Sequence, residues 1–155
     1  MTSIHHEPVV KTQMFIRRPV GEVFQAFTDP SITTKFWFTK SSGKLEKGKR
    51  ILWEWEMYGV SDEVYVEESI ENKKIVVQFS DSTKTEWSFH EKPNEGTLVS
   101  ITNYGFHGNE DEIVAKAIDS MGGYTIVLCS LKALLEHNIQ LNVVADKAPD
   151  AHVHR

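Results

Sequence analysis

The chain has 155 residues, of which 40% are hydrophobic and 25% are charged, and its formal net charge at pH 7 is −5. These values are typical of one globular domain and disfavour a disordered or low-complexity chain. The acidic balance also disfavours nucleic-acid binding and electrostatic adhesion to an anionic membrane.

The sequence holds one cysteine, Cys129, so an internal disulfide and a cysteine-based zinc cluster are excluded. Because free cysteine behaves as a small hydrophobe, Cys129 is expected to be a buried, inert thiol. No run of about 18 apolar residues is present, so no membrane insertion is expected. A cytoplasmic location is the resulting prediction.

The first third of the chain predicts a strand followed by two short helices. Alternating apolar residues indicate a strand over residues 9–17. Pro19 fits the first position of a helix that continues to Thr28, since its missing N–H costs nothing there. Pro30 can open a second short helix, and residues 41–49 are typical of a loop or a weak edge strand.

From residue 50 to residue 104 the pattern is almost entirely that of β-strands. Within 51–57, isoleucine, two tryptophans and methionine alternate with glutamates, which favours a strand over a helix. Turn signals separate the further predicted strands, which are 63–71, 74–80, 83–91 and 97–104. The short turns predict antiparallel neighbours in a meander.

A long helix is predicted over residues 110–141. Asn109 can cap it, with Glu112 in capping-box position. Gly122 and Gly123 interrupt it, which allows close approach of the sheet, a bend, or room for something else. The apolar stripe of this helix comprises Val114, Ala117, Ile118, Met121, Tyr124, Thr125, Leu128, Leu131, Leu135 and Ile139.

This order of elements predicts an α+β fold with the helices segregated from the strands. A twisted antiparallel sheet can wrap around the long helix, so that the inner side of the sheet and the helix stripe share one core.

Several stretches together resemble the START-like (SRPBCC) superfamily, and within it the branch named for the activator of the heat-shock-protein ATPase. Residues 15–30 match the strand-to-helix opening of that family, and the Phe-Trp pair 36–37 lies where members tend to have a tryptophan. Residues 48–51, 68–76 and 121–124 match a strand start, a hairpin between middle strands and the C-terminal helix.

The resemblance implies a helix-grip fold: a curved antiparallel sheet wrapped around a long C-terminal helix, with two short helices after the first strand. It places a single START-like domain at residues 9–141, with 1–8 and 142–155 as flexible tails. It also implies a cavity between the sheet and the long helix that holds small apolar or aromatic molecules. It does not imply one activity, because the superfamily includes binders, transporters, cyclases and co-chaperone modules.

The candidate ligand-binding residues lie on the predicted inner faces or at the cavity mouth. They are Trp37, Trp53, Trp55, Glu68, Thr85, Trp87, Phe89, Asn103, His107, Met121, Tyr124 and Leu128. The aromatic residues either fill the core or line a pocket. Strand alternation aims Glu68 inward, where burial would raise its pKa, although a solvated glutamate at the strand end is the simpler alternative. His107 is expected at the rim.

No catalytic residue, metal site or cofactor is predicted. The histidines form no HExxH pattern, and no GxSxG, Walker or dinucleotide-binding motif occurs. The leading hypothesis is therefore a module that binds a small hydrophobic or aromatic molecule. One alternative is a cyclase, dehydrase or hydrolase in the same cavity, using Glu68, Asn103, Thr85, Tyr124 and His107. The other is a module that modulates a chaperone ATPase. A homodimer and a chaperone partner are left open.

Overall fold

The computed structural model describes residues 7–153. Its elements in chain order are β1 (Val10–Ile16), α1 (Val20–Thr28), α2 (Pro30–Thr33), β2 (Lys40–Ser41), β3 (Arg50–Trp55), η1 (Glu56–Tyr58), β4 (Val60–Ile70), β5 (Lys74–Gln78), β6 (Lys84–Lys92), β7 (Gly96–Tyr104), α3 (Glu110–His137), α4 (Val143–Asp146) and η2 (Pro149–Ala151).

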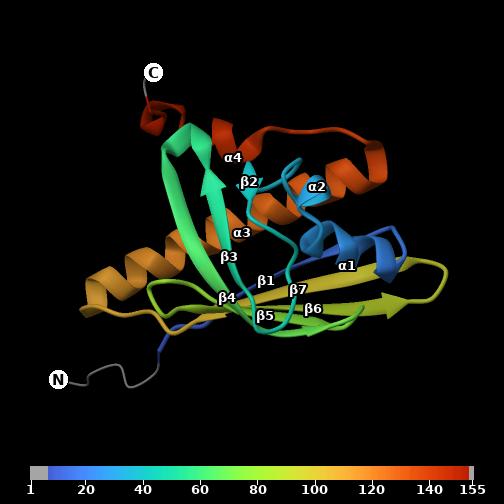
Figure 1. Ribbon diagram of the computed structural model, residues 1–155, viewed down its shortest axis with the longest axis horizontal. Helices are drawn as coiled ribbons and strands as arrows, with labels where there is room; N and C mark the ends of the chain where they lie inside the picture. The colour runs from blue at the N-terminus through green and yellow to red at the C-terminus, as the bar shows by residue number, and fades with distance from the viewer. Residues whose placement is uncertain (1–6, 154–155) are drawn as a thin grey trace.

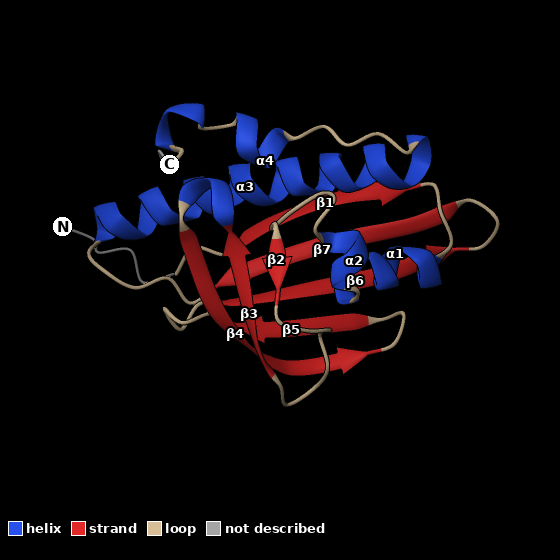
Figure 2. Cartoon of the chain, turned by 45° about the horizontal axis from the view of Figure 1, so that its top comes forward, coloured by secondary structure: helices blue, strands red, loops and turns tan. Residues whose placement is uncertain are grey.

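The strands form one seven-stranded antiparallel sheet in the order β1-β7-β6-β5-β4-β3-β2. Consecutive strands from β2 to β7 pair with each other, while β1 pairs with the last strand, β7. The helices lie on one face of this sheet, and α3 runs across it (Figures 1 and 2). The predicted α+β class and helix-grip architecture are confirmed.

The core lies between the sheet and the C-terminal half of α3. Leu128, Leu131 and Leu134 of the helix are buried there against the inward side chains of the strands. Although α3 is long and apolar enough by composition to cross a membrane, this half of it is the core helix of the domain. The predicted cap at its start is confirmed, because Asn109 Oδ1 accepts a hydrogen bond of 2.9 Å from the Glu112 N–H.

The N-terminal half of α3 differs from the prediction of a continuous buried stripe. Ile118 is 69% exposed, and Val114 and Met121 are also exposed. Cys129 is exposed as well, contrary to expectation, because the neighbouring Leu128 and Ser130 occupy the buried side of the helix. Periodicity indicates which residues share a helix face, but it does not show how far the sheet beneath that face extends.

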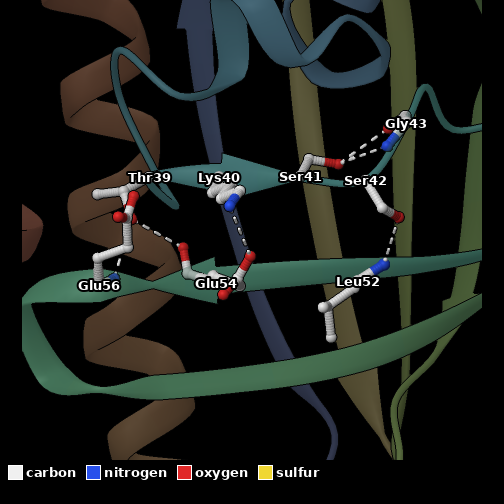
Figure 3. Close-up of polar contacts among 8 residues, drawn as sticks. All are labelled: Thr39, Lys40, Ser41, Ser42, Gly43, Leu52, Glu54 and Glu56. Carbon is white, nitrogen blue, oxygen red and sulfur yellow. Dashed lines mark hydrogen bonds and ion pairs between the residues drawn. The ribbon is translucent and has the colours of Figure 1, made fainter.

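Strand β2 ties the segment after α2 to the sheet, and side chains extend this two-residue strand at both ends (Figure 3). The Thr39 hydroxyl donates to the Glu54 carbonyl at 3.0 Å and accepts from the Glu56 N–H at 2.9 Å. At the other end, the Leu52 N–H donates to the Ser42 hydroxyl at 2.9 Å. This pairing holds the preceding Trp37 and Phe38 over the sheet.

The segment after α3 (residues 138–153, here the C-terminal segment) packs against the domain. Asn138 ends α3 in the left-handed conformation, and the chain then returns along the helix toward η1 (Figures 1 and 2). The Tyr58 hydroxyl donates to the Val144 carbonyl, and the Val153 N–H donates to the Met57 carbonyl at 2.9 Å. The described part of the segment predicted as a flexible tail, 142–155, thus contains α4 and η2 and makes these contacts with the domain. Residues 1–6 of the predicted N-terminal tail and residues 154–155 lie outside the described residues.

Candidate functional site

A pocket of about 640 Å³ opens between the start of α3, the ends of the central strands and the C-terminal segment. Six aromatic side chains from six different places in the chain line it: Trp37, Trp55, Tyr58, Phe79, Phe106 and Tyr124. Val60, Ile126 and Val144 add aliphatic surface. This composition is typical of sites for small organic molecules, which are mostly apolar with a few polar groups.

Trp37 connects the pocket to the core. Its ring centroid lies 4.9 Å from that of Trp53 and 5.9 Å from that of Tyr124. Behind it, Phe38 stacks on Trp53 at 4.7 Å with an angle of 18° between the planes. The aromatic wall of the pocket is therefore the outer layer of the packed core, which restricts the movement of its rings.

A chain of hydrogen-bonded polar side chains lies along the sheet side of the pocket. The Asn103 amide donates to the Thr85 hydroxyl at 3.0 Å, and the Thr85 hydroxyl lies 2.8 Å from that of Tyr124. The Ser120 hydroxyl donates to Asn103 Oδ1. Thr85 and Asn103 are direct partners across β6 and β7, and Ser120 and Tyr124 lie one turn apart on α3. The network thus joins the helix to the sheet at the pocket wall.

Burial raises the pKa of Tyr124 far above its usual range, and the negative charges of Asp81 and Asp62 raise it further. The hydrogen bond with Thr85 opposes this shift only partly. Tyr124 is therefore a neutral phenol throughout the physiological range. It can donate a hydrogen bond, but it cannot act as a base.

Charged residues surround the pocket on the solvent side. Asp62, Asp81 and Asp119 contribute carboxylates, and Lys116 and Lys147 contribute ammonium groups. Asp81 is fixed by the Thr83 N–H at 3.0 Å and the Thr83 hydroxyl at 2.7 Å. Among the residues of the described chain, none of the three carboxylates makes an ion pair within 4 Å, and no group of three or more His, Cys, Asp or Glu could hold a metal ion.

The structure brings five of the twelve candidate residues together. Trp37, Trp55, Asn103 and Tyr124 line the pocket, and Thr85 is hydrogen-bonded behind Tyr124. Four others fill the core rather than the pocket wall, namely Trp53, Trp87, Phe89 and Leu128. Both readings of the aromatic residues therefore apply, each to a different subset.

Three candidates lie away from the pocket. Met121 and His107 are exposed and do not line it. The expectation that Glu68 points inward is wrong, because the register of β4 against β5 shifts between Val66 and Glu68. That bulge turns Glu68 outward, where it pairs with Lys74 at 3.4 Å. The enzyme alternative thus loses two of its five proposed groups from the pocket.

The C-terminal segment contributes to the pocket, and its sequence pattern did not predict this. Val144, Lys147 and Ala148 line the pocket, although they were placed in a tail. The signal available was the apolar run that begins at Val143, which can cover a surface but is too short to predict an element.

Gly123, the second glycine of the pair in α3, lies at the pocket. Gly123 lines the pocket, and a Cβ atom built at this position would have no neighbour within 4 Å. Of the three alternatives for the pair, the structure at Gly123 corresponds to room for something else. Glycine there gives up about 1 kcal/mol of helix propensity relative to alanine.

Comparison with known proteins gives a family and a fold. The model of the family described as Activator of Hsp90 ATPase homolog 1-like protein matches residues 17–136. Protein SSP2350 from Staphylococcus saprophyticus is 28% identical, with a TM-score of 0.76, over 86% of this chain and 96% of that one. No match was found among curated proteins.

Two further solved structures share the fold at lower identity. One is the Aha1 dimer from Colwellia psychrerythraea, which is 21% identical with a TM-score of 0.72, over 84% of this chain and 97% of that one. The other is CalU16 from Micromonospora echinospora, which is 14% identical with a TM-score of 0.68, over 92% of this chain and 83% of that one.

Proposed function

Since the chain belongs to the family of Activator of Hsp90 ATPase homolog 1-like proteins, we propose that it binds a small apolar or aromatic molecule in the pocket beside α3. The observation that carries the proposal is the pocket of about 640 Å³ with its six aromatic side chains. No catalytic activity is part of the proposal.

The energetics of the pocket depend on whether solvent can enter it. At about 24 cal/mol per Å³, an empty apolar void of this volume would cost roughly 15 kcal/mol, which matches the upper end of the stability of a whole domain. Because the pocket opens to solvent, water fills it when no ligand is bound. Displacing that water from the aromatic wall is the driving force for an apolar ligand.

A large side chain introduced at position 123 would occupy the pocket and so tests this function. We expect Gly123→Phe to place a ring in the pocket without a clash, because the space around a Cβ at this position is open. The unmodified protein is first screened with a panel of uncharged aromatic compounds and fatty acids. A compound that binds should raise Tm by about 5–10 °C when its concentration is 100 times its Kd. The variant should fold and lose this shift.

Ala115→Phe is the matched control, since Ala115 is an exposed residue of the same helix outside the pocket. It should retain the shift. A panel that leaves Tm unchanged in the unmodified protein would contradict the proposed function, and so would a ligand shift that survives in Gly123→Phe.

The predicted homodimer and chaperone partner do not depend on the pocket. The Colwellia protein is a dimer, and the family description refers to an ATPase activator, so both partners remain predictions for this chain. Sedimentation and a pull-down with the chaperone of the same cell test them separately. The cytoplasmic location likewise stays a prediction.

A further inference from the structure

The direction of each hydrogen bond in the polar network can be assigned, starting from Asn103. Its side-chain nitrogen lies 2.8 Å from the Lys84 carbonyl oxygen, which can only accept. The NH₂ group must therefore face this carbonyl, and its second hydrogen reaches the Thr85 hydroxyl at 3.0 Å. The amide oxygen then faces Ser120, whose hydroxyl donates to it.

The assignment of Asn103 determines that of Thr85. The Thr85 hydroxyl accepts from the Asn103 amide, and its own hydrogen needs an acceptor because the residue is fully buried. The only such partner among the described residues is the Tyr124 hydroxyl oxygen at 2.8 Å. Thr85 therefore donates and Tyr124 accepts.

Tyr124 is left with a hydroxyl hydrogen that no described residue accepts. Tyr124 lines the pocket, as do Asn103 and Ser120 of the same network, so the pocket is where this hydrogen can find an acceptor. The phenol stays protonated, since burial raises its pKa far above its usual range. The pocket thus offers one oriented hydrogen-bond donor beside its aromatic wall.

The charged groups near the Tyr124 hydroxyl influence which charge a ligand can carry. Asp62 and Asp81 both line the pocket, and their negative charges add to the effect of burial in raising the pKa of Tyr124. Lys116 and Lys147 line the pocket too, but the charges that shift the pKa of Tyr124 are those of the two aspartates. An anionic ligand oxygen at the same point would meet the same repulsion. A neutral oxygen acceptor avoids it.

We infer that the pocket selects an uncharged aromatic molecule with a carbonyl oxygen, such as a ketone, ester or amide, and that the Tyr124 hydroxyl donates a hydrogen bond to that oxygen. This inference rests on the proposed function, because it specifies which molecule the same pocket takes. The aromatic wall supplies affinity for the rings, and Tyr124 determines the preference for the carbonyl.

Three probes of similar size separate these contributions: benzophenone, diphenylmethane and the diphenylacetate anion. In the unmodified protein, benzophenone should bind about fivefold more tightly than diphenylmethane, the ratio that one added hydrogen bond supplies. Diphenylacetate should bind more weakly than benzophenone although it carries more acceptor oxygens. In Tyr124→Phe, benzophenone and diphenylmethane should bind equally well.

Tyr65→Phe is the matched variant, since it makes the same substitution at a tyrosine of β4 that does not line the pocket. It should keep the preference for benzophenone. The carbonyl stretching band of bound benzophenone gives a readout that a merely structural role would not move. It should lie at lower wavenumber than in hexane for the unmodified protein, and shift back toward the hexane value in Tyr124→Phe.

The outcomes distinguish this inference from the proposed function. Equal binding of benzophenone and diphenylmethane by the unmodified protein, or an unshifted carbonyl band, overturns the inference and leaves a pocket for apolar molecules. Tighter binding of diphenylacetate also overturns it. If none of the three probes binds but another compound of the panel does, the inference fails alone; if no compound of the panel binds either, the proposed function fails with it. Should Tyr124→Phe not fold, the carbonyl band in the unmodified protein and in Tyr65→Phe still decides.

Discussion

At the scale of single residues, Glu136 joins the end of α3 to the end of β1. Its carboxylate accepts hydrogen bonds from the Arg17 N–H at 2.9 Å and from Lys132 Nζ at 2.7 Å. Lys132 Nζ also donates to the Phe15 carbonyl at 2.8 Å. Burial by itself raises the pKa of Glu136, but these hydrogen bonds and nearby positive charges outweigh it, and the net pKa is lowered.

The lowered pKa predicts an acid-dependent contribution to stability. A carboxyl whose pKa is lower in the folded state stabilises the fold fully above its unfolded value of about 4.3, and this stabilisation is lost as pH falls through the folded value. Glu136→Gln should reduce the free energy of unfolding by about 1–2 kcal/mol at pH 7, and the difference should shrink below about pH 4. Urea unfolding at several pH values measures it.

Glu91→Gln is the control, since Glu91 is exposed and makes no ion pair with any residue in the range 7–153. Its effect should stay within about 0.5 kcal/mol. If Glu136→Gln lowered the free energy of unfolding equally at pH 7 and pH 3.5, the stabilisation would not come from the ionised carboxylate of Glu136.

Alternation of residue type predicted the inward side chains well where the strands are regular. Ile51 and Trp53 are buried as expected, and Trp55 lines the pocket. The pattern fails at Met57, which lies in η1, and at Glu68, which follows a bulge. A bulge adds one residue to a strand, and nothing in the local sequence marks it, so every residue beyond it is assigned to the wrong face.

At the scale of elements, β2 depends on side-chain hydrogen bonds as much as on its two residues (Figure 3). Thr39→Val should destabilise the domain by about 1 kcal/mol, because the Thr39 hydroxyl makes two hydrogen bonds to the β3 end and valine makes none. Lys40→Ala should change stability by less than about 0.5 kcal/mol, since Lys40 is 67% exposed and lies 3.9 Å from Glu54.

Chemical denaturation of these two variants compares the hydroxyl with the ion pair on the same strand. An equal effect of both substitutions would show that β2 is held by something other than the Thr39 hydroxyl. If Lys40→Ala lowered the free energy of unfolding by several kcal/mol, the exposed ion pair between Lys40 and Glu54 would contribute far more than expected.

The starts of the helices could be predicted from the sequence more accurately than the end of α3. Asn109 and Pro30 predicted two helix starts correctly, because capping and the fixed φ of proline act locally. The end of α3 was placed at residue 141 instead of His137, since apolar Ile139 and Leu141 continue the pattern beyond Asn138. Whether those residues stay helical depends on the turn that Asn138 makes, and both are exposed in the structure.

At the scale of the whole molecule, the C-terminal segment supplies one wall of the pocket. Removing residues 142–155 should leave the fold intact, because the core lies between the sheet and the C-terminal half of α3. Ligand affinity should fall about tenfold, which corresponds to roughly 55 Å² of lost apolar contact at 25 cal/mol per Å². Circular dichroism checks the fold, and a fluorescence titration of the unmodified and truncated proteins measures Kd.

Tyr58→Phe is the finer comparison, since it removes the hydrogen bond to the Val144 carbonyl and keeps the ring in the pocket. It should weaken binding by less than the truncation does. Unchanged affinity after truncation would show that the segment does not contribute to the binding site.

The pairing of β1 with β7 has a consequence for how the chain is made. Val10 lies opposite Asn103 in the finished sheet, so more than ninety residues must leave the ribosome before the first strand finds its partner. Contacts this distant in sequence slow folding and leave intermediates exposed for longer. Once β7 has emerged, its outer edge stays unpaired until β1 docks on it, and an unpaired edge strand promotes aggregation.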